Sequence, residues 1–166
     1  MSSTNTVLNG VQFKGNQADK GGGVYLVGGS TLTMNDLNVD GSQATADGGF
    51  LYVENSAASV INLVLTGSPV IKNTQATNGG VFYIDSSNAY LDLRVPSYIT
   101  NINASGKGGI AYISKASKVD IYSGTFTNVY SNSSGSMIYS ISSATVYTIK
   151  NTIASCFLTS FLGTYP

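Results

Sequence analysis

Few residues in this 166-residue chain could support catalysis or metal binding, and they are scattered. The chain contains no histidine, which excludes histidine general bases and histidine metal ligands. Its single cysteine, Cys156, has no histidine to activate the thiol and no second cysteine for a disulfide or a CxxC zinc site. We therefore predict a non-enzymatic protein without a cofactor, in which Cys156 is a small buried hydrophobic residue.

One pair of acidic residues is expected to lie close together. Asp92 and Asp120 occupy equivalent places in two segments that alternate apolar and polar residues. If these segments stack, the carboxylates lie about 4.8 Å apart and repel unless a cation or a shared proton relieves them. A calcium site needs about six to eight oxygen ligands, whereas Arg94 and Lys118 are near in sequence. We expect a salt-bridged surface pair and no metal site, with Asp92 and Asp120 as only a weak candidate.

Composition excludes further classes of function. Eight Lys plus Arg balance eight Asp plus Glu, so the clustered positive charge of a nucleic-acid-binding protein is missing. The sequence has no run of about 18 apolar residues and therefore predicts no transmembrane helix. Its first residues do not resemble a signal peptide. Because 42% of the residues are apolar, we expect one folded domain.

A repeated element dominates the sequence. Each copy has a Gly-Gly-x-x-Tyr pattern, with Ser136 in place of the second glycine in the last. The tyrosines are 27, 31, 29 and 27 residues apart. The copies are 21–25, 48–52, 79–83, 108–112 and 135–139.

Two further elements recur with the same period. The first has an apolar residue three positions before a small polar one, and its polar members are Asn16, Ser42, Asn73, Asn101 and Asn128. The second alternates apolar, polar and apolar residues, and its copies are 32–34, 61–63, 91–93, 119–121 and 147–149. Aligned by motif, the central residues of these copies predict a ladder of Thr33, Asn62, Asp92, Asp120 and Thr148. We expect the Asn/Ser positions to form a second ladder with a folding role.

Each repeat of about 28 residues thus holds three short segments with strand periodicity, separated by turn residues. Three short strands cannot bury a face alone, but stacked copies can. The sequence predicts an all-β fold, a single-stranded parallel β-helix of about five turns with three strands per turn. We assign residues 1–149 to the β-helix repeats and 150–166 to an apolar cap or inter-subunit segment.

The pairing of an F-x-x-N-like element with a Gly-Gly-x-hydrophobic-Tyr element over residues 10–140 resembles the repeats of chlamydial polymorphic outer-membrane proteins. It also resembles right-handed β-helix repeats in other surface proteins of bacteria and protists. The resemblance implies a right-handed helix, an extracellular or cell-surface location, and a structural or adhesive role.

Strand alternation predicts which side chains face outward. Glu54 and Asp85 should face water, and the tyrosines share their parity. This reading places Leu51, Val53, Phe82, Ile84, Ala111 and Ile113 in the core. It places an exposed aromatic stripe on the surface as a contact site, formed by Tyr25, Tyr52, Tyr83, Tyr112 and Tyr139, with Phe50, Val81, Ile110 and Met137 beside them. The alternative is that a kink inverts the parity and stacks the tyrosines inside.

Two other features bear on assembly and modification. N-glycosylation sequons begin at Asn103 and Asn132, one repeat apart. The uncharged C-terminal segment offers apolar residues for a cap or an inter-subunit contact: Phe157, Leu158, Phe161, Leu162 and Tyr165.

These features favour a non-catalytic, extracellular structural or adhesive protein that forms a fibre or surface coat. Uncapped strand edges and a head-to-tail contact that does not close would generate a filament. The alternatives are a glycan-binding module that uses the tyrosine ladder and a segment of a larger surface adhesin. The expected partners are copies of the chain, other surface proteins or glycans.

Overall fold

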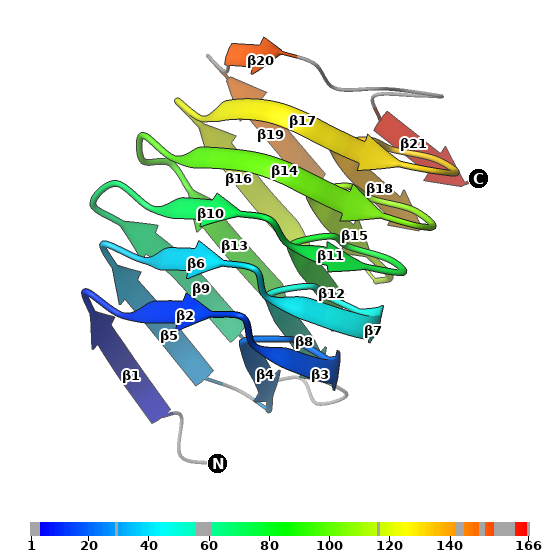
Figure 1. Cartoon of the computed structure of the whole chain (residues 1–166). Helices are drawn as coiled ribbons and strands as arrows, with labels where there is room; N and C mark the ends of the chain where they lie inside the picture. Colours follow the sequence, from blue (N-terminus) through cyan, green and yellow to red (C-terminus); the bar gives the residue numbers. More distant parts are fainter. Residues whose placement is uncertain are drawn as a thin grey trace.

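The chain folds as a stack of parallel β-strands, as a computed structural model shows (Figure 1). The structure describes residues 4–28, 30–55, 61–115, 117–141, 145–149, 152–154 and 162–165. Every regular element in these ranges is a strand, and none is a helix that could cross a membrane. The two termini lie at opposite ends of the stack.

Three sheets form the walls of the solenoid, and each turn of the chain contributes to all three. Sheet A contains β1 (Thr4–Asn9), β5 (Ser30–Asn35), β9 (Ile61–Thr66), β13 (Ala89–Leu93), β16 (Lys118–Tyr122) and β19 (Thr145–Ile149). Sheet B contains β2 (Gln12–Lys14), β3 (Gln17–Lys20), β6 (Asn38–Asp40), β7 (Gln43–Asp47), β10 (Val70–Lys72), β11 (Gln75–Ala76), β14 (Tyr98–Ala104), β17 (Thr125–Ser131) and β20 (Thr152–Ala154). Sheet C contains β4 (Val24–Val27), β8 (Leu51–Asn55), β12 (Phe82–Ser86), β15 (Ala111–Ile113), β18 (Ile138–Ile141) and β21 (Leu162–Tyr165).

Equivalent residues of successive turns lie directly over one another. Tyr52 pairs with Tyr83 and Tyr83 with Tyr112, while Leu63 pairs with Leu91 in sheet A. All pairings between described strands are parallel, which confirms the predicted parallel β-solenoid with three strands per turn.

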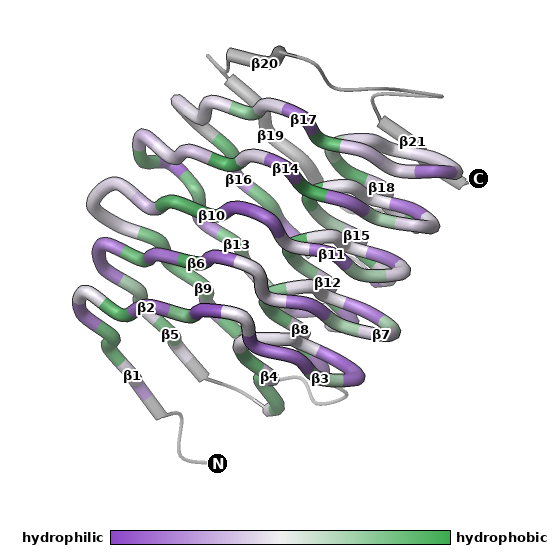
Figure 2. Tube along the Cα trace, in the orientation of Figure 1, coloured by the Kyte–Doolittle hydropathy of each residue, from purple (hydrophilic) through white to green (hydrophobic). Residues whose placement is uncertain are grey.

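The core fills the space between the three sheets. Leu51, Val53, Phe82, Ile84, Ala111 and Ile113 are completely buried in it, as strand alternation predicts. Residues of sheets A and B complete the same cluster, among them Leu63, Leu91 and Ile99. Hydrophilic residues are prominent on β3 and β7, whereas apolar residues alternate along the strands of sheet A (Figure 2).

The corner between sheets B and C corrects one expectation. Phe50, Val81, Ile110 and Met137 were expected outside, but all four are buried in the core. The amides of both Phe50 and Leu51 donate to the carbonyl of Val81, at 3.0 and 2.9 Å. This bulge-like corner interrupts the alternation, so that two consecutive side chains point inward in each turn.

A second correction concerns the Asn/Ser ladder, whose predicted alignment is displaced by one residue between early and late turns. Lys72 pairs with Asp40 and with Thr100, which places Asn73 and Asn101 over Gly41 rather than over Ser42. Gly41, Asn73, Asn101 and Asn128 all have positive φ, a conformation that glycine and asparagine tolerate best. Asn73, Asn101 and Asn128 form a real ladder, because each amide donates to the side chain of the turn before: Asn73 to Asp40 at 2.7 Å, Asn101 to Asn73 at 3.1 Å and Asn128 to Asn101 at 3.0 Å.

The ladder predicted in sheet A is also only partly right. Asp92 pairs with Asp120, as expected. Asn62, however, pairs with Thr31 and Tyr90, while Val64 lies between Thr33 and Asp92. Asp120 pairs with Tyr147 instead of Thr148. The column therefore consists of Thr33, Val64, Asp92, Asp120 and Tyr147, because the sequence copies were aligned by pattern and not by register.

The described strands after residue 150 extend the sheets. Thr152–Ala154 pairs with Thr125–Thr127, and Leu162–Tyr165 pairs with Ile138–Ile141. Leu162 and Tyr165 thus lie in a strand that continues sheet C. The predictions for Cys156, Phe157, Leu158 and Phe161 fall outside the described residues.

Candidate binding surfaces

The five repeat tyrosines form a continuous column of stacked rings along sheet C. Neighbouring ring centroids are 5.2, 5.0, 4.7 and 5.2 Å apart from Tyr25 to Tyr139, and the first three pairs are within 6° of parallel. The rings lie outside the apolar core cluster, and Tyr25 is exposed while Tyr83 and Tyr112 are partly exposed, so the column lies on the outer side of sheet C. Each inner ring nevertheless has a neighbouring ring on both faces.

The column is less exposed than the sequence suggested. Tyr25 is 48% exposed, whereas Tyr52 and Tyr139 are each only 4% exposed. The ammonium of Lys20 lies 4.6 Å from the centroid of the Tyr52 ring and donates to its hydroxyl. Lys107 makes the same pair of contacts with Tyr139. The expectation of a contact stripe along all five tyrosines is therefore wrong for these two, because lysines from the preceding corner cover them.

Burial changes the acid–base behaviour of these phenols. Removal from water raises the pKa of Tyr52, Tyr83 and Tyr112, because the charged phenolate is disfavoured in a low-dielectric environment. The pKa of Tyr25 is raised chiefly by its hydrogen bond to the Glu54 carboxylate. The phenols of Tyr25, Tyr52, Tyr83 and Tyr112 are consequently neutral over the physiological pH range.

The acidic pair on sheet A is neutralised by its neighbours. The Arg94 guanidinium bonds the Asp92 carboxylate at 2.6 Å, and the Lys118 ammonium lies 3.0 Å from Asp120. The Tyr90 hydroxyl donates to Asp120 at 2.7 Å. Arg94 holds the pKa of Asp92 below its usual value, and burial with the Asp120 bond raises the pKa of Tyr90 to about 12. The predicted salt-bridged ladder is confirmed for Asp92 and Asp120, and the described residues contain no cluster of three potential metal ligands.

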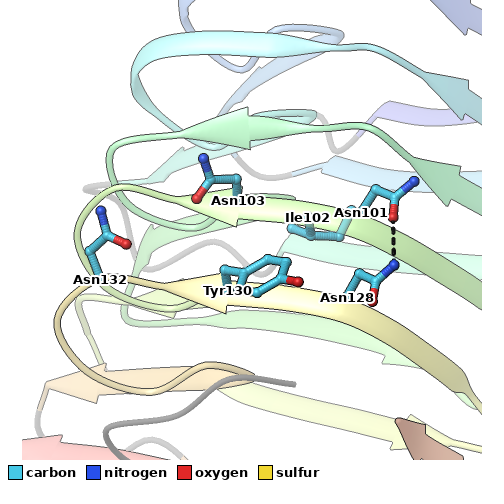
Figure 3. A pocket seen from close by; sticks show the side chains of 6 residues that line it. All are labelled: Asn101, Ile102, Asn103, Asn128, Tyr130 and Asn132. Carbon is cyan, nitrogen blue, oxygen red and sulfur yellow. Dashed lines mark hydrogen bonds between the residues drawn. The ribbon is translucent and has the colours of Figure 1, made fainter. Parts of the chain in front are cut away.

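A shallow groove on the outer face of sheet B was not expected from the sequence. It has a volume of about 490 Å³ and lies over β14 and β17. Its lining residues are Asn101, Ile102, Asn103, Asn128, Tyr130 and Asn132 (Figure 3). A smaller hollow of about 250 Å³ adjoins it and shares Asn103.

The two sequon asparagines lie in this groove. Both Asn103 and Asn132 are exposed, as an acceptor for a glycan must be. Tyr130 pairs with Asn103 across the two strands and lies between Asn128 on β17 and Asn132 just after the end of that strand. Tyr130 was not predicted as a site residue, although it lies within the last copy of the repeated element that contains Asn128, because the equivalent position of the preceding turn carries Asn103 and not an aromatic residue. The signal that could have found it is an aromatic residue at an outward position of a predicted strand.

The first turn forms a third distinctive surface. Its strands β1, β2, β3 and β4 stand at the ends of their sheets and have a described partner strand on one side only. Three of the five exposed large hydrophobic residues of the described chain belong to this turn, namely Val7, Tyr25 and Val27. The remaining two, Tyr98 and Tyr130, lie on sheet B.

Comparison with known proteins adds no family assignment. No protein-family model, curated protein or solved structure matches the chain. The parallel β-solenoid fold accordingly rests on the structure itself.

Proposed function

We propose that this protein is a non-catalytic structural or adhesive β-solenoid of the cell surface or extracellular space, which assembles end to end through its first turn. The observation that carries the proposal is that β1, β2, β3 and β4 each have a described partner strand on one side only. An open parallel edge presents rows of unpaired N–H and C=O groups that can pair with another chain.

The side chains of this edge support association. Val7 and Val27 are 51% and 60% exposed. Strands β1 and β4 contain no charged residue, whereas β2 and β3 carry Lys14, Asp19 and Lys20, so association would centre on β1 and β4. Natural proteins usually protect an open edge with charges, proline or a covering segment. Tyr25 stacks on Tyr52, its one ring partner among the described residues, so a ring from a second copy could extend the column.

The contact would be head to tail, because the first turn of one copy would meet the last turn of the next. Such heterologous contacts produce filaments when their rotation does not close. The stacked turns would give the filament a stiff, regular core. The resemblance of the paired sequence elements to chlamydial surface-protein repeats supports a surface location and a right-handed helix.

The tyrosine column is a poor platform for glycans. A sugar stacks on the face of an aromatic ring, but the inner rings lie about 5 Å from their neighbours. This geometry disfavours the alternative in which the column itself binds glycans.

Replacing Val27 with lysine tests the proposal. We expect Val27→Lys to shift the protein from filaments toward monomer, because an exposed lysine on an edge strand opposes edge-to-edge pairing. Sedimentation velocity and negative-stain electron microscopy over a range of concentrations measure this shift. The monomer should retain its β-sheet circular dichroism.

Tyr98→Lys is the matched control. Tyr98 is 45% exposed but lies on sheet B, away from the edge, so this variant should assemble like the wild type. A wild-type chain that remains monomeric at all concentrations would contradict end-to-end assembly and favour a segment of a larger surface adhesin.

A further inference from the structure

The outer face of sheet B is chemically different from the open edge. The groove over β14 and β17 and its adjoining hollow are lined by amides, hydroxyls, three aliphatic residues and one tyrosine, with no charged residue among them. From this lining we propose that the groove binds neutral oligosaccharides. The proposal does not depend on end-to-end assembly, because the groove lies on the side of the solenoid.

The amides of the groove match the chemistry of sugar hydroxyls. A carboxamide offers two donors and an acceptor, and a hydroxyl donates and accepts in the same way. Among the described residues, the side-chain amides of Asn103 and Asn132 form no hydrogen bond to the protein, whereas Asn101 and Asn128 bond each other. Asn103 and Asn132 can therefore bind a ligand without breaking a protein contact.

Tyr130 supplies the aromatic surface that such a site needs. It is 37% exposed and stands between the amides of Asn128 and Asn132 (Figure 3). The face of an aromatic ring is electron-rich and packs against the C–H face of a pyranose. Binding sites commonly combine an apolar or aromatic surface with a few placed polar groups.

The shape of the site favours a chain of sugars over a single ring. The two hollows share Asn103 and together cover β7, β11, β14 and β17 in neighbouring turns. Thr45, Gln75 and Thr77 add hydroxyl and amide groups along this track. The Asn73–Asn101–Asn128 ladder fixes the backbone beside it, so the site is largely formed before a ligand binds.

A nuclear magnetic resonance titration tests the proposal. The full chain, produced in bacteria so that both sequons are unmodified, is titrated with cellohexaose, chitohexaose and maltohexaose. We expect saturable shifts of the Asn103 and Asn132 side-chain amide signals with at least one of them, with a dissociation constant of about 1 mM or lower. Heparin hexasaccharide, which is highly anionic, should bind more weakly.

Variants separate the groove from the rest of the surface. Tyr130→Ala should weaken binding at least about tenfold, as expected of a central aromatic contact, and Asn132→Ala in the exposed turn should weaken it as well. Tyr98→Ala should bind like the wild type, because Tyr98 is exposed on the same sheet but does not line the groove. Ser134→Ala removes a sequon without removing an amide and should also leave binding unchanged.

Three results would overturn the proposal. They are no saturable shift with any of the three neutral saccharides, unchanged binding by both Tyr130→Ala and Asn132→Ala, and tighter binding of heparin hexasaccharide. Val27→Lys should bind saccharide normally, so a failure of assembly and a failure of glycan binding are distinguishable.

Discussion

Gly49→Ala is expected to lower the free energy of unfolding by more than about 3 kcal/mol, a loss typical of severe core disruption. A Cβ at Gly49 would lie 2.2 Å from the Gly80 carbonyl oxygen and 2.8 Å from that of Gln75. Both oxygens belong to the backbone of the next turn, which cannot yield without separating the stacked strands. Urea denaturation followed by circular dichroism measures the loss.

Gly10→Ala is the matched control for this variant. Gly10 has a φ of +59°, and no atom lies within 4 Å of the place that an alanine methyl group would occupy. The substitution therefore meets only the left-handed backbone penalty of about 1–2 kcal/mol. If Gly49→Ala were no more destabilising than Gly10→Ala, the close approach of successive turns would be refuted.

Phe82→Ala is expected to cost about 3–5 kcal/mol. The Phe82 side chain is completely buried and packs edge to face against Phe50, with ring centroids 6.4 Å apart. Its removal leaves a cavity in the middle of the solenoid, where strands on both sides hold the walls apart. The midpoint of urea unfolding should fall accordingly.

Tyr98→Ala serves as the reference for loss of an exposed aromatic residue. A surface substitution of this kind usually changes stability by less than about 0.5 kcal/mol. Equal effects of Phe82→Ala and Tyr98→Ala would contradict the assignment of Phe82 to the core.

Most of the fold could be predicted from the repeat. Because the tyrosines recur every 27 to 31 residues, one repeat corresponds to one turn, and residues such as Tyr52 and Tyr83 must stack. Alternation after each tyrosine then places Val53 and Ile84 in the core, as observed. Both inferences depend on local spacing, which is visible in a single sequence.

The corners and the side surface were not predictable in the same way. Phe50 faces inward because the amides of Phe50 and Leu51 both donate to the Val81 carbonyl. The residue pattern gives no signal of this backbone geometry. One left-handed position of sheet B is a glycine in an early turn (Gly41) and an asparagine in later turns (Asn73 and Asn101). Because the residue type changes, the sequence pattern aligned the asparagines with Ser42 and gave the wrong register. The groove joins Asn103 to Tyr130 across two turns, at a position where the earlier turns carry Gln43 and Gln75, so that only the last copy is aromatic.

Nuclear Overhauser effects between neighbouring strands test the stacked solenoid most directly. The structure predicts cross-peaks between backbone protons of Tyr52 and Tyr83 in sheet C, Leu63 and Leu91 in sheet A, and Ile71 and Ile99 in sheet B. All three should appear with the pattern of parallel strands. Their absence, together with the strong Hα–Hα contacts of antiparallel pairs, would contradict the fold and both proposed binding surfaces.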